Sequence, residues 1–300
     1  MNNDFFVLNN VDLYRHNSMR IHANAEQLYF PHSVQGLIQL CEQFRCSKDM
    51  LVLGKGSNTI FLSDNYSRPV ICTDFLNRID FVKGKLKVQC GATLSELAWF
   101  AMEKGIGGYE FLEDIPGSVG GALFMNAGTY DDTISQLVDS VTVYDYGSKR
   151  VQTLTGSELK PHWGKRESYF QKEDCCILEC TLKADCLRNR ADILDKMLET
   201  KKNRYAKQPR EYPNAGSVFK RPHIEGKPLY VWKLLEEAGL RGYRVGGAAV
   251  SDKHPGFIVN IDNCSGKDLE MLLDCCKKSV KELFGIELEE EWRIVKEEER

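Results

Sequence analysis

One stretch of sequence limits the possible folds more than any other: IPGSVGGA at residues 115–122, followed by NAG at 126–128. This density of glycine around one proline exceeds what a surface turn needs. Backbone without side chains can wrap closely around a cofactor, with amide groups and small side chains touching its pyrophosphate and ring edges. A glycine-rich crossover between packed strands is the alternative. The predicted cofactor contacts in this stretch are Pro116, Gly117, Ser118, Gly120, Gly121, Asn126 and Gly128.

A second glycine-rich segment, LGKGSN at residues 53–58, ends a short apolar run that is typical of a buried strand. It is not a Walker loop, because no Gly-Lys-Ser/Thr ends it. It also departs from the GxGxxG fingerprint, since the third glycine position holds Thr59. A plain tight turn explains this segment alone nearly as well. Together the two segments predict one phosphate-bearing cofactor on a non-Rossmann scaffold, with further contacts from Gly54, Lys55, Gly56, Ser57 and Asn58.

Hydrophobic periodicity predicts helices and short strands that do not alternate regularly along the chain. The expected helices are residues 33–44, a segment from the capping box at 93–96 to Gly105, 187–208 and 267–284. The expected strands are 50–53, 86–90, the hairpin 141–144 with 150–154, 175–182 and 291–295. This mixture favours an α+β fold. The composition changes near residues 185–190, where a charged helical stretch begins, and predicts a domain boundary there.

Composition places the chain among globular proteins, with 42% hydrophobic and 28% charged residues. A net charge of -3 gives no general attraction to nucleic acid. No apolar run approaches the roughly 18 residues of a membrane span, and Met1–Asn10 lacks the pattern of a signal peptide. We expect a cytoplasmic protein that acts as a monomer and contacts neither nucleic acid nor membrane.

The eleven cysteines are expected to be free residues of the core. Their number is odd, and no CxxC pair occurs. Buried cysteine packs as a small hydrophobe, and a reducing cytosol keeps it free. A metal site would need ligand spacings that the sequence lacks, so no metal is predicted.

Five motifs in a fixed order resemble those of the UDP-N-acetylenolpyruvoylglucosamine reductases. Two of them resemble the FAD-binding domain of these enzymes: GKGSN at 54–58, and IPGSVGGA at 115–122 with NAG at 126–128. Three more resemble the arginine, serine and C-terminal glutamate motifs: GKRES at 164–168, NAGSVF at 214–219 and LEEEWR at 288–293. The resemblance extends from about residue 30 to residue 295. Without a long insertion between Arg166 and Ser217, the chain is similar to the shorter type of the family, which lacks an extra substrate-covering loop.

The resemblance implies an FAD-binding region of the vanillyl-alcohol-oxidase type over 1–187, in two subdomains of about 1–75 and 76–187. It implies a C-terminal α+β substrate domain over 188–300, whose last strand returns toward the flavin. The implied activity is the NADPH-dependent reduction, through FAD, of UDP-N-acetylglucosamine enolpyruvate to UDP-N-acetylmuramate in peptidoglycan precursor synthesis. FAD, NADPH and the UDP-sugar are therefore the implied cofactors and partners.

The family reaction places negative charge at C2 of the enolpyruvyl group, and this charge must be stabilised and then protonated. Ser217 is the implied proton donor, exposed on a tight turn after Gly216. Arg166 is implied to offer fixed donors to a carboxylate or enolate oxygen. Glu291 is implied to orient the reacting centre or to share a proton with it. From residue type alone, Ser217 is typical of a loop cap and Glu291 of a solvated acidic strand edge.

The diphosphate of the implied substrate requires cationic and polar side chains. The candidates that flank the serine motif are Arg204, Lys207, Asn214, Arg221 and His254. Arg204 and Lys207 are equally typical of basic residues near a helix C-terminus.

Two other functions stay open: a related FAD-dependent oxidoreductase with another substrate, and a non-catalytic protein that binds flavin or nucleotide. Asp114 stands directly before Ile115, where the family has glycine. Aspartate tolerates a positive φ better than most residues, so we expect a glycine-like conformation there.

Overall fold

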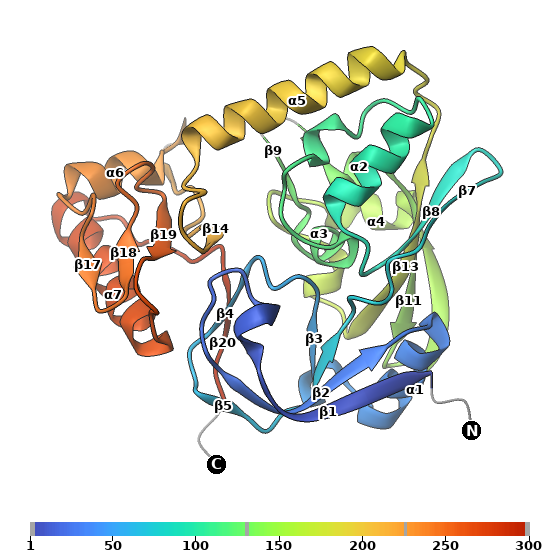
Figure 1. Ribbon diagram of the computed structural model, residues 1–300, viewed down its shortest axis with the longest axis horizontal. Coiled ribbons are helices and arrows are strands. Elements are labelled where there is room, and N and C mark those ends of the chain that lie inside the picture. Colours follow the sequence, from blue (N-terminus) through green and yellow to red (C-terminus); the bar gives the residue numbers. More distant parts are fainter. Residues whose placement is uncertain (1–3, 130–131, 225–226, 298–300) are drawn as a thin grey trace. The chain divides into compact units, whose positions relative to one another are not determined.

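The computed structural model describes residues 4–129, 132–224 and 227–297 (Figure 1). It divides into two compact units, each built from separate segments of the chain. The first unit contains Met1–Asn9, Gln27–Lys55 and Arg68–Asn203. The second contains Asn10–Glu26, Gly56–Ser67 and Arg204–Arg300. The domain boundary expected at residue 187 stays a prediction.

One sheet of the first unit is antiparallel, with the strand order β12-β11-β13-β8-β7 (Figure 1). Its strands are β7 (Ile79–Val82), β8 (Lys85–Gln89), β11 (Val138–Asp145), β12 (Arg150–Thr155) and β13 (Cys175–Lys183). The expected hairpin is confirmed, because β11 and β12 pair from Ser140 with Thr155 to Asp145 with Arg150. The expected strand 175–182 is confirmed as β13, and its alternating side chains Leu178, Cys180 and Leu182 are buried in the core.

A second sheet has the order β1-β2-β6-β3, with β5 beside β2. Its strands are β1 (Phe5–Asp12), β2 (Asn24–Pro31), β3 (Leu51–Leu53), β5 (Asn65–Tyr66) and β6 (Val70–Cys72). Val70 pairs in parallel with both Leu28 and Leu51, so β3 is the buried strand that the apolar run predicted. Gly54 follows β3 directly, and the sheet thereby fixes the start of the GKGSN segment.

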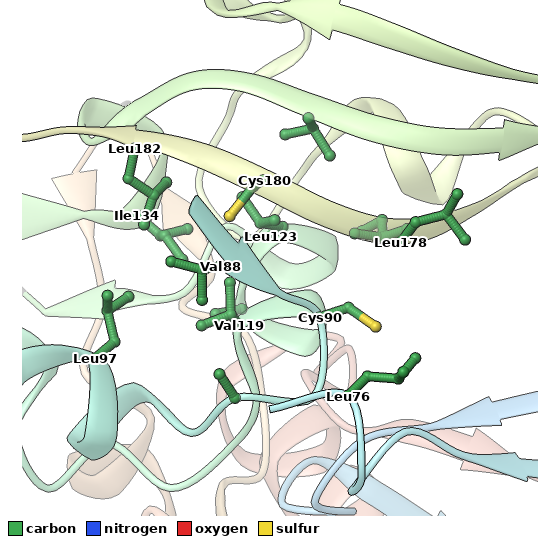
Figure 2. Close-up of a cluster of buried hydrophobic side chains, with 14 of the residues drawn as sticks. Leu76, Val88, Cys90, Leu97, Val119, Leu123, Ile134, Leu178, Cys180 and Leu182 are labelled. Carbon is green, nitrogen blue, oxygen red and sulfur yellow. The ribbon is translucent and has the colours of Figure 1, made fainter. Parts of the chain in front are cut away.

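Two helices of the first unit begin where their capping residues predict. Ser33 accepts a hydrogen bond from Gly36 N at the start of α1 (Val34–Phe44). Thr93 and Glu96 form both halves of a capping box at the start of α2 (Leu94–Glu103), and Gly105 follows that helix with φ +70°. Figure 2 shows side chains from β8, β13, α2 and α3 (Val119–Met125) packed together in the core of this unit.

Helix α3 covers part of the glycine-rich stretch 115–122, where the sequence predicted no helix. The Ser118 side chain accepts a hydrogen bond from Gly121 N, which caps the helix and offsets the poor helix propensity of the two glycines. A Cβ at Gly120 would lie 2.9 Å from Cys90 Cβ, so glycine lets the first turn approach the end of β8 closely. The glycines of this stretch therefore serve close packing as well as turns.

The second unit has an antiparallel sheet in the order β14-β19-β18-β17. Its strands are β14 (Asn214–Ser217), β17 (Arg244–Val245), β18 (Ala248–Val250) and β19 (Phe257–Asn260). Its helices are α6 (Val231–Glu237) and α7 (Gly266–Phe284). Helix α7 is confirmed almost to the residue, because Ser265 and Asp268 form a capping box and Gly285 ends it with φ +69°.

The last strand, β20 (Arg293–Val295), pairs in parallel with β4 (Thr59–Phe61). Both strands belong to the second unit. The expected strand over 291–295 thus begins two residues later than predicted, and Glu291 lies just before it.

The remaining elements are shorter or join the two units. The short pairs are β9 (Gly128–Thr129) with β10 (Asp132–Thr133) and β15 (His223–Ile224) with β16 (Lys227–Pro228). Helix α4 (Gly156–Leu159) follows β12, and the charged stretch predicted as helical is α5 (Arg190–Lys207). Within the described ranges, no helix has the length and apolar character that crossing a membrane requires.

All eleven cysteines are free. Seven are buried, among them Cys41, Cys90 and Cys180, which confirms the expected place in the core for these seven; the other four are half-buried. Burial raises the pKa of the Cys90 thiol to about 12, so this side chain stays protonated and unreactive near neutral pH.

Candidate active site

The two glycine-rich segments meet in the first unit. A Cβ built at Gly54 would lie 2.2 Å from the Ser118 hydroxyl oxygen, so only glycine fits at that point. Beyond Gly54, the Lys55 ammonium lies 2.9 Å from an Asp74 carboxylate oxygen in the same unit. The segments predicted to share one cofactor therefore lie side by side at Gly54 and Ser118.

Several backbone amides of the second segment have partners within the protein. Val119 N donates to Ala92 O at 2.8 Å, and Gly120 N donates to Cys90 O at 2.7 Å. Gly121 N donates to the Ser118 hydroxyl at 3.3 Å. Helix α3 and its packing on β8 use these three N–H groups, so a cofactor contact at Gly120 or Gly121 involves other atoms of these residues. Both contacts stay predictions.

Asp114 has φ +64°, which confirms the glycine-like conformation predicted for it. Its backbone N–H donates to the Ser95 hydroxyl at 3.3 Å. Its neighbour Glu113 is buried, and one Glu113 carboxylate oxygen lies 3.1 Å from the Lys201 ammonium. The residues in front of Pro116 are therefore held at a fixed place in the first unit.

Arg166 lies in a tight turn whose ends, Gly164 and Glu167, exchange two backbone hydrogen bonds of 3.1 and 3.2 Å. Its φ of +62° is unusual for a residue with a long side chain. Both terminal nitrogens of the guanidinium lie 3.4 Å from Gly128 O. The Gln171 side chain donates to Arg166 O at 3.0 Å and so holds the turn from its other side.

Asn126 links this turn to the glycine-rich stretch. Its side-chain Nδ2 donates to Gly164 O at 2.7 Å, and its φ of +44° ends helix α3. The other amide atom, Oδ1, is buried and accepts no hydrogen bond from the described part of the chain. A buried acceptor of this kind is costly to leave unsatisfied, so it suits a donor that a ligand brings.

The serine motif lies on β14 in the second unit. Gly216 has φ +79°, and the pairing of β14 with β19 shifts register between Asn214 and Ser217. The irregularity leaves the Ser217 side chain exposed while Val218 is fully buried, as the sequence predicts.

Asn214 stabilises the turn before the serine. Its side-chain Nδ2 donates to Pro209 O at 2.8 Å and to Tyr212 O at 3.0 Å, while its Oδ1 accepts from Gly216 N at 3.2 Å. These contacts hold the backbone around Gly216, and the predicted contact of Asn214 with substrate stays a prediction.

Glu291 lies beside the serine motif within the second unit. Its backbone N–H donates to Val218 O at 2.8 Å, and an antiparallel bridge joins Phe219 with Glu290. On its other side, Glu291 O accepts from the Asn58 side-chain amide at 3.0 Å. The structure therefore brings Ser217, Glu291 and Asn58 into one hydrogen-bonded neighbourhood.

The neighbouring acids of the same run pair with lysines. Glu287 lies 2.7 Å from Lys281, and Glu289 lies 3.3 Å from Lys220. The Lys281 hydrogen bond holds the pKa of the Glu287 carboxyl below its usual value. A third lysine, Lys277, pairs with Glu290. The composition-based expectation of a solvated acidic edge thus describes these neighbours.

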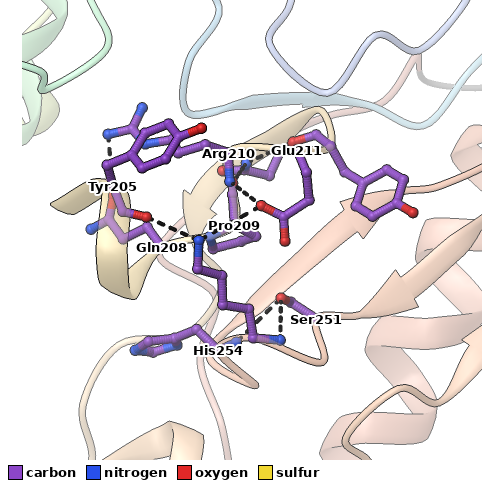
Figure 3. A network of polar contacts seen from close by, with 10 residues as sticks. Tyr205, Gln208, Pro209, Arg210, Glu211, Ser251 and His254 are labelled. Carbon is purple, nitrogen blue, oxygen red and sulfur yellow. Dashed lines mark hydrogen bonds and ion pairs between the residues drawn. The ribbon is translucent and has the colours of Figure 1, made fainter. Parts of the chain in front are cut away.

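His254 lies half-buried in a loop that a polar network holds (Figure 3). The Ser251 hydroxyl accepts from His254 N at 3.2 Å, and His254 Nδ1 accepts from Gly256 N at 3.1 Å. Burial lowers the pKa of the imidazole, which favours the neutral ring that this accepted bond requires. Lys253, a residue that the sequence did not single out, donates to Tyr205 O at 2.9 Å and anchors the loop.

The remaining candidates also belong to the second unit. The Arg221 guanidinium stacks 4.9 Å from the centre of the Tyr230 ring. Arg204 and Lys207 lie in the last turn of α5, where cations are ordinary, and Lys207 is exposed.

Sequence motifs found individual residues, but they missed those that hold the motifs in place. Gln171 and Lys253 contribute hydrogen bonds to backbone carbonyls, and neither has a neighbouring pattern that predicts such a role. Arg166 belongs to the first unit and Ser217 to the second.

Comparisons with known proteins identify matches for most of the chain. The family model of the UDP-N-acetylenolpyruvoylglucosamine reductase C-terminal domain matches residues 208–295, and an FAD binding domain model matches residues 25–154. The UDP-N-acetylenolpyruvoylglucosamine reductase of Thermotoga maritima is 37% identical over 93% of this chain and 95% of its own length. The enzyme of that name from Clostridium perfringens is 36% identical over 93% of this chain and 90% of its own length.

A solved structure shows the same fold. The UDP-N-acetylenolpyruvylglucosamine reductase of Thermus caldophilus superposes with a TM-score of 0.80 at 29% identity. The match covers 97% of this chain and 99% of that one. An α+β fold with an FAD-binding domain of the vanillyl-alcohol-oxidase type, as expected from the sequence, is therefore confirmed.

Proposed function

The chain belongs to the UDP-N-acetylenolpyruvoylglucosamine reductase family, and we propose on that premise which residues carry its reaction. It is an FAD-dependent oxidoreductase that reduces UDP-N-acetylglucosamine enolpyruvate to UDP-N-acetylmuramate with NADPH, in peptidoglycan precursor synthesis. One observation carries the assignment of roles. The Glu291 N–H bonds to the carbonyl of Val218, directly after Ser217, so both acid–base residues belong to one pair of hydrogen-bonded segments.

The first unit fits FAD on two observations. Glycine at position 54 lets the GKGSN segment pack directly against Ser118, so the two glycine-rich segments are held together. Asn126 keeps a buried acceptor atom available to a ligand donor. When bound, FAD supplies the redox chemistry by accepting hydride from NADPH and delivering it to C3 of the enolpyruvyl group. The residues of this unit assigned to holding it are Gly54, Lys55, Pro116, Gly117, Ser118, Gly120, Gly121, Asn126 and Gly128. Gly56 and Ser57, which belong to the second unit, stay predicted contacts. Asn58, also predicted as a contact, donates its side-chain amide to Glu291 O and is not assigned to FAD.

Ser217 is assigned as the acid that protonates C2 of the substrate. Its exposed position after a glycine with positive φ supports this role, because a substrate atom can reach the hydroxyl. A serine hydroxyl is a weak acid, so it needs a neighbour that stabilises the alkoxide or returns a proton. Glu291, held beside Val218, is assigned to that task.

Arg166 is assigned to the negative charge that develops on the substrate carboxylate and enolate oxygen. A guanidinium keeps its charge at any physiological pH and presents donors in a fixed plane. The two contacts of Arg166 with Gly128 O and the tight turn around it restrict its orientation before substrate arrives. Such preorganisation favours the transition state over the ground state.

Arg221, Arg204 and Lys207 are assigned to the diphosphate of the substrate. The contact with the Tyr230 ring restrains the Arg221 guanidinium, whose N–H groups can donate to phosphate oxygens. His254 is assigned as a neutral polar contact through Nε2–H, because its Nδ1 already accepts from Gly256 N. Asn214 is assigned to the same site, in addition to its bonds within the turn.

The proposal includes a cytoplasmic monomer that contacts neither nucleic acid nor membrane. The small net charge of -3 supports the absence of nucleic-acid binding. Size-exclusion chromatography with light scattering tests the oligomeric state, and a dimer mass would contradict it.

Anaerobic stopped-flow absorbance of the FAD-loaded protein tests the reaction. NADPH is expected to bleach the flavin band, and UDP-N-acetylglucosamine enolpyruvate is expected to restore it. Bleaching that the enolpyruvyl sugar does not reverse would indicate another oxidant on the same fold. Failure to retain FAD would indicate a non-catalytic binder and contradict the assigned cofactor contacts.

A further inference from the structure

We propose that Asn58 is a positioning residue for Glu291, and that it acts on the protonation step through the Glu291 backbone. This inference rests on the proposed role of Glu291. Asn58 Nδ2 donates to Glu291 O at 3.0 Å, and Asn58 O accepts from Arg293 N at 2.8 Å. All three residues belong to the second unit, so these contacts lie within one compact body.

The ladder between β4 and β20 ends just short of Glu291. Its first pair is Thr59 with Arg293, so Glu291 lies two residues before the paired strand. A segment outside a ladder keeps its orientation only if other groups satisfy its backbone. For Glu291 O that group is the Asn58 side chain, and for Glu291 N it is Val218 O at 2.8 Å.

Asn58 therefore contacts the chain on both sides of Trp292, through its side chain at Glu291 and its main chain at Arg293. The Val218 bond fixes the edge of Glu291 that faces the serine motif. Loss of the Asn58 amide removes the hydrogen bond that holds the Glu291 carbonyl. The Glu291 main chain is then less firmly positioned relative to Ser217, and misplacement by about 1 Å can cost about one hundredfold in rate.

The chemistry at this position calls for a side-chain N–H donor. Asn58→Asp replaces the donor with a carboxylate that faces the Glu291 carbonyl and repels it. Asn58→Ala removes the donor and adds no charge. Asn58→Gln keeps an amide on a longer stem and provides the conservative rescue variant.

Tyr66→Phe is a matched control, because the Tyr66 hydroxyl donates to Val295 O at 2.8 Å. This bond also joins a side chain of the second unit to a carbonyl in the last strand, but at the strand's other end. Its loss tests whether loosening β20 in general is enough to slow the reaction.

The experiment measures both half-reactions of the FAD-loaded protein by anaerobic stopped flow. For Asn58→Ala, reoxidation of the flavin by the enolpyruvyl sugar is expected to slow about ten- to one hundredfold, with flavin content and NADPH-driven reduction unchanged. Asn58→Gln is expected to recover part of the loss, and Tyr66→Phe to leave both half-reactions unchanged. Loss of flavin, or slowing of the NADPH step alone, would instead make Asn58 a cofactor contact and overturn the proposal.

A double variant tests whether Asn58 acts through Glu291. If it does, Asn58→Ala combined with Glu291→Gln reoxidises no more slowly than Glu291→Gln alone. If the double variant instead showed the product of the two single-variant rate reductions, the proposal would be overturned. If the enolpyruvyl sugar does not reoxidise the flavin of the wild-type protein, the proposed function is wrong. If the wild-type protein is active and Asn58→Ala is as fast as the wild type, only the proposal for Asn58 is wrong.

Hydrogen exchange measured by mass spectrometry gives a readout that needs no activity. Asn58→Ala is expected to increase exchange in peptides covering residues 289–293, whereas Tyr66→Phe increases it nearer residue 295. Unchanged exchange over 289–293 in Asn58→Ala would overturn the proposal whatever the protein catalyses.

Discussion

The Asn126 side chain donates a 2.7 Å hydrogen bond to the Gly164 carbonyl, and so ties the end of the glycine-rich stretch to the turn that carries Arg166. The two motifs are separated by many residues in sequence, yet the contact makes them one structural element of the first unit. This bond therefore joins the residue proposed for cofactor contact to the turn of the residue proposed for charge stabilisation.

Replacing Asn126 by glycine should loosen this link without straining the backbone. Glycine keeps the φ of +44°, which alanine would strain, while the amide is lost. We expect the free energy of unfolding to fall by about 1–3 kcal/mol and the KM for the enolpyruvyl sugar to rise. Urea unfolding and steady-state kinetics measure the two effects. If neither the free energy of unfolding nor the KM changed, the Asn126 hydrogen bond would not be needed to position the Arg166 turn.

Ser217→Ala should block protonation while leaving NADPH-driven flavin reduction intact. Removal of a general acid typically costs about 10²–10⁴-fold in rate. The side chain is exposed, so the substitution leaves no buried cavity and stability should change little. Single-turnover stopped flow separates the two half-reactions. If the variant also failed to reduce its flavin, the role assigned to Ser217 would be wrong.

Gly54→Ala should weaken flavin binding, because the new methyl group would overlap the Ser118 hydroxyl at 2.2 Å. Overpacking of this kind costs about 1–3 kcal/mol. Ser118→Gly removes the clashing atom, at a cost to the cap of α3 of only about a few tenths of a kcal/mol. We therefore expect the double variant to bind FAD more tightly than Gly54→Ala alone, as measured by flavin fluorescence titration. An additive loss in the double variant would refute the contact.

His254 should make the folded protein less stable in mild acid. Burial lowers the pKa of its imidazole below the ordinary 6.5, so the unfolded chain takes up a proton where the folded chain does not. This contribution to the free energy of unfolding is complete above pH 6.5 and decreases as the pH falls from 6.5 toward the lowered pKa. Urea unfolding of the wild type and His254→Gln from about pH 8 to about pH 5 measures it. Parallel curves for the two proteins would contradict the assignment.

Asp114 should tolerate glycine better than alanine. Its φ of +64° lies in the left-handed region, where a residue with a Cβ is less stable by roughly 1–2 kcal/mol. This penalty is smaller for aspartate, because its short polar side chain can form local hydrogen bonds. We expect Asp114→Gly to unfold at the same urea concentration as the wild type or a higher one. Asp114→Ala is expected to unfold at a lower concentration than both. Equal urea midpoints for the two variants would show that the positive φ does not determine which residues are tolerated at position 114.

Local signals in the sequence predict much of the fold. Ser33, the Thr93 capping box and Gly285 each act on residues a few positions away, and the helices that they delimit form as expected. Helix α3 was not predicted, because Gly120 and Gly121 are poor helix formers. The Ser118 cap and the close packing at the end of β8 stabilise this helix.

The contacts that organise the candidate site depend on tertiary pairing, which the sequence pattern does not contain. Asn58 reaches Glu291 only because β4 pairs with β20, and nothing in either motif predicts that register. Motif resemblance therefore named Asn58 and Glu291 separately without predicting their contact. The roles of the site residues stay predictions until the variants are measured.

The parallel pairing of β4 with β20 also has a consequence for synthesis on the ribosome. Residues 59–61 leave the exit tunnel long before their partner strand at 293–295 is translated. A nascent chain can fold the local hairpins and helices of the first unit while the edge of β4 that pairs with β20 is still unpaired. The second unit therefore acquires its β4–β20 pair only after residue 295 has been translated. Until then the edge of β4 is unpaired and can bind a chaperone or another chain.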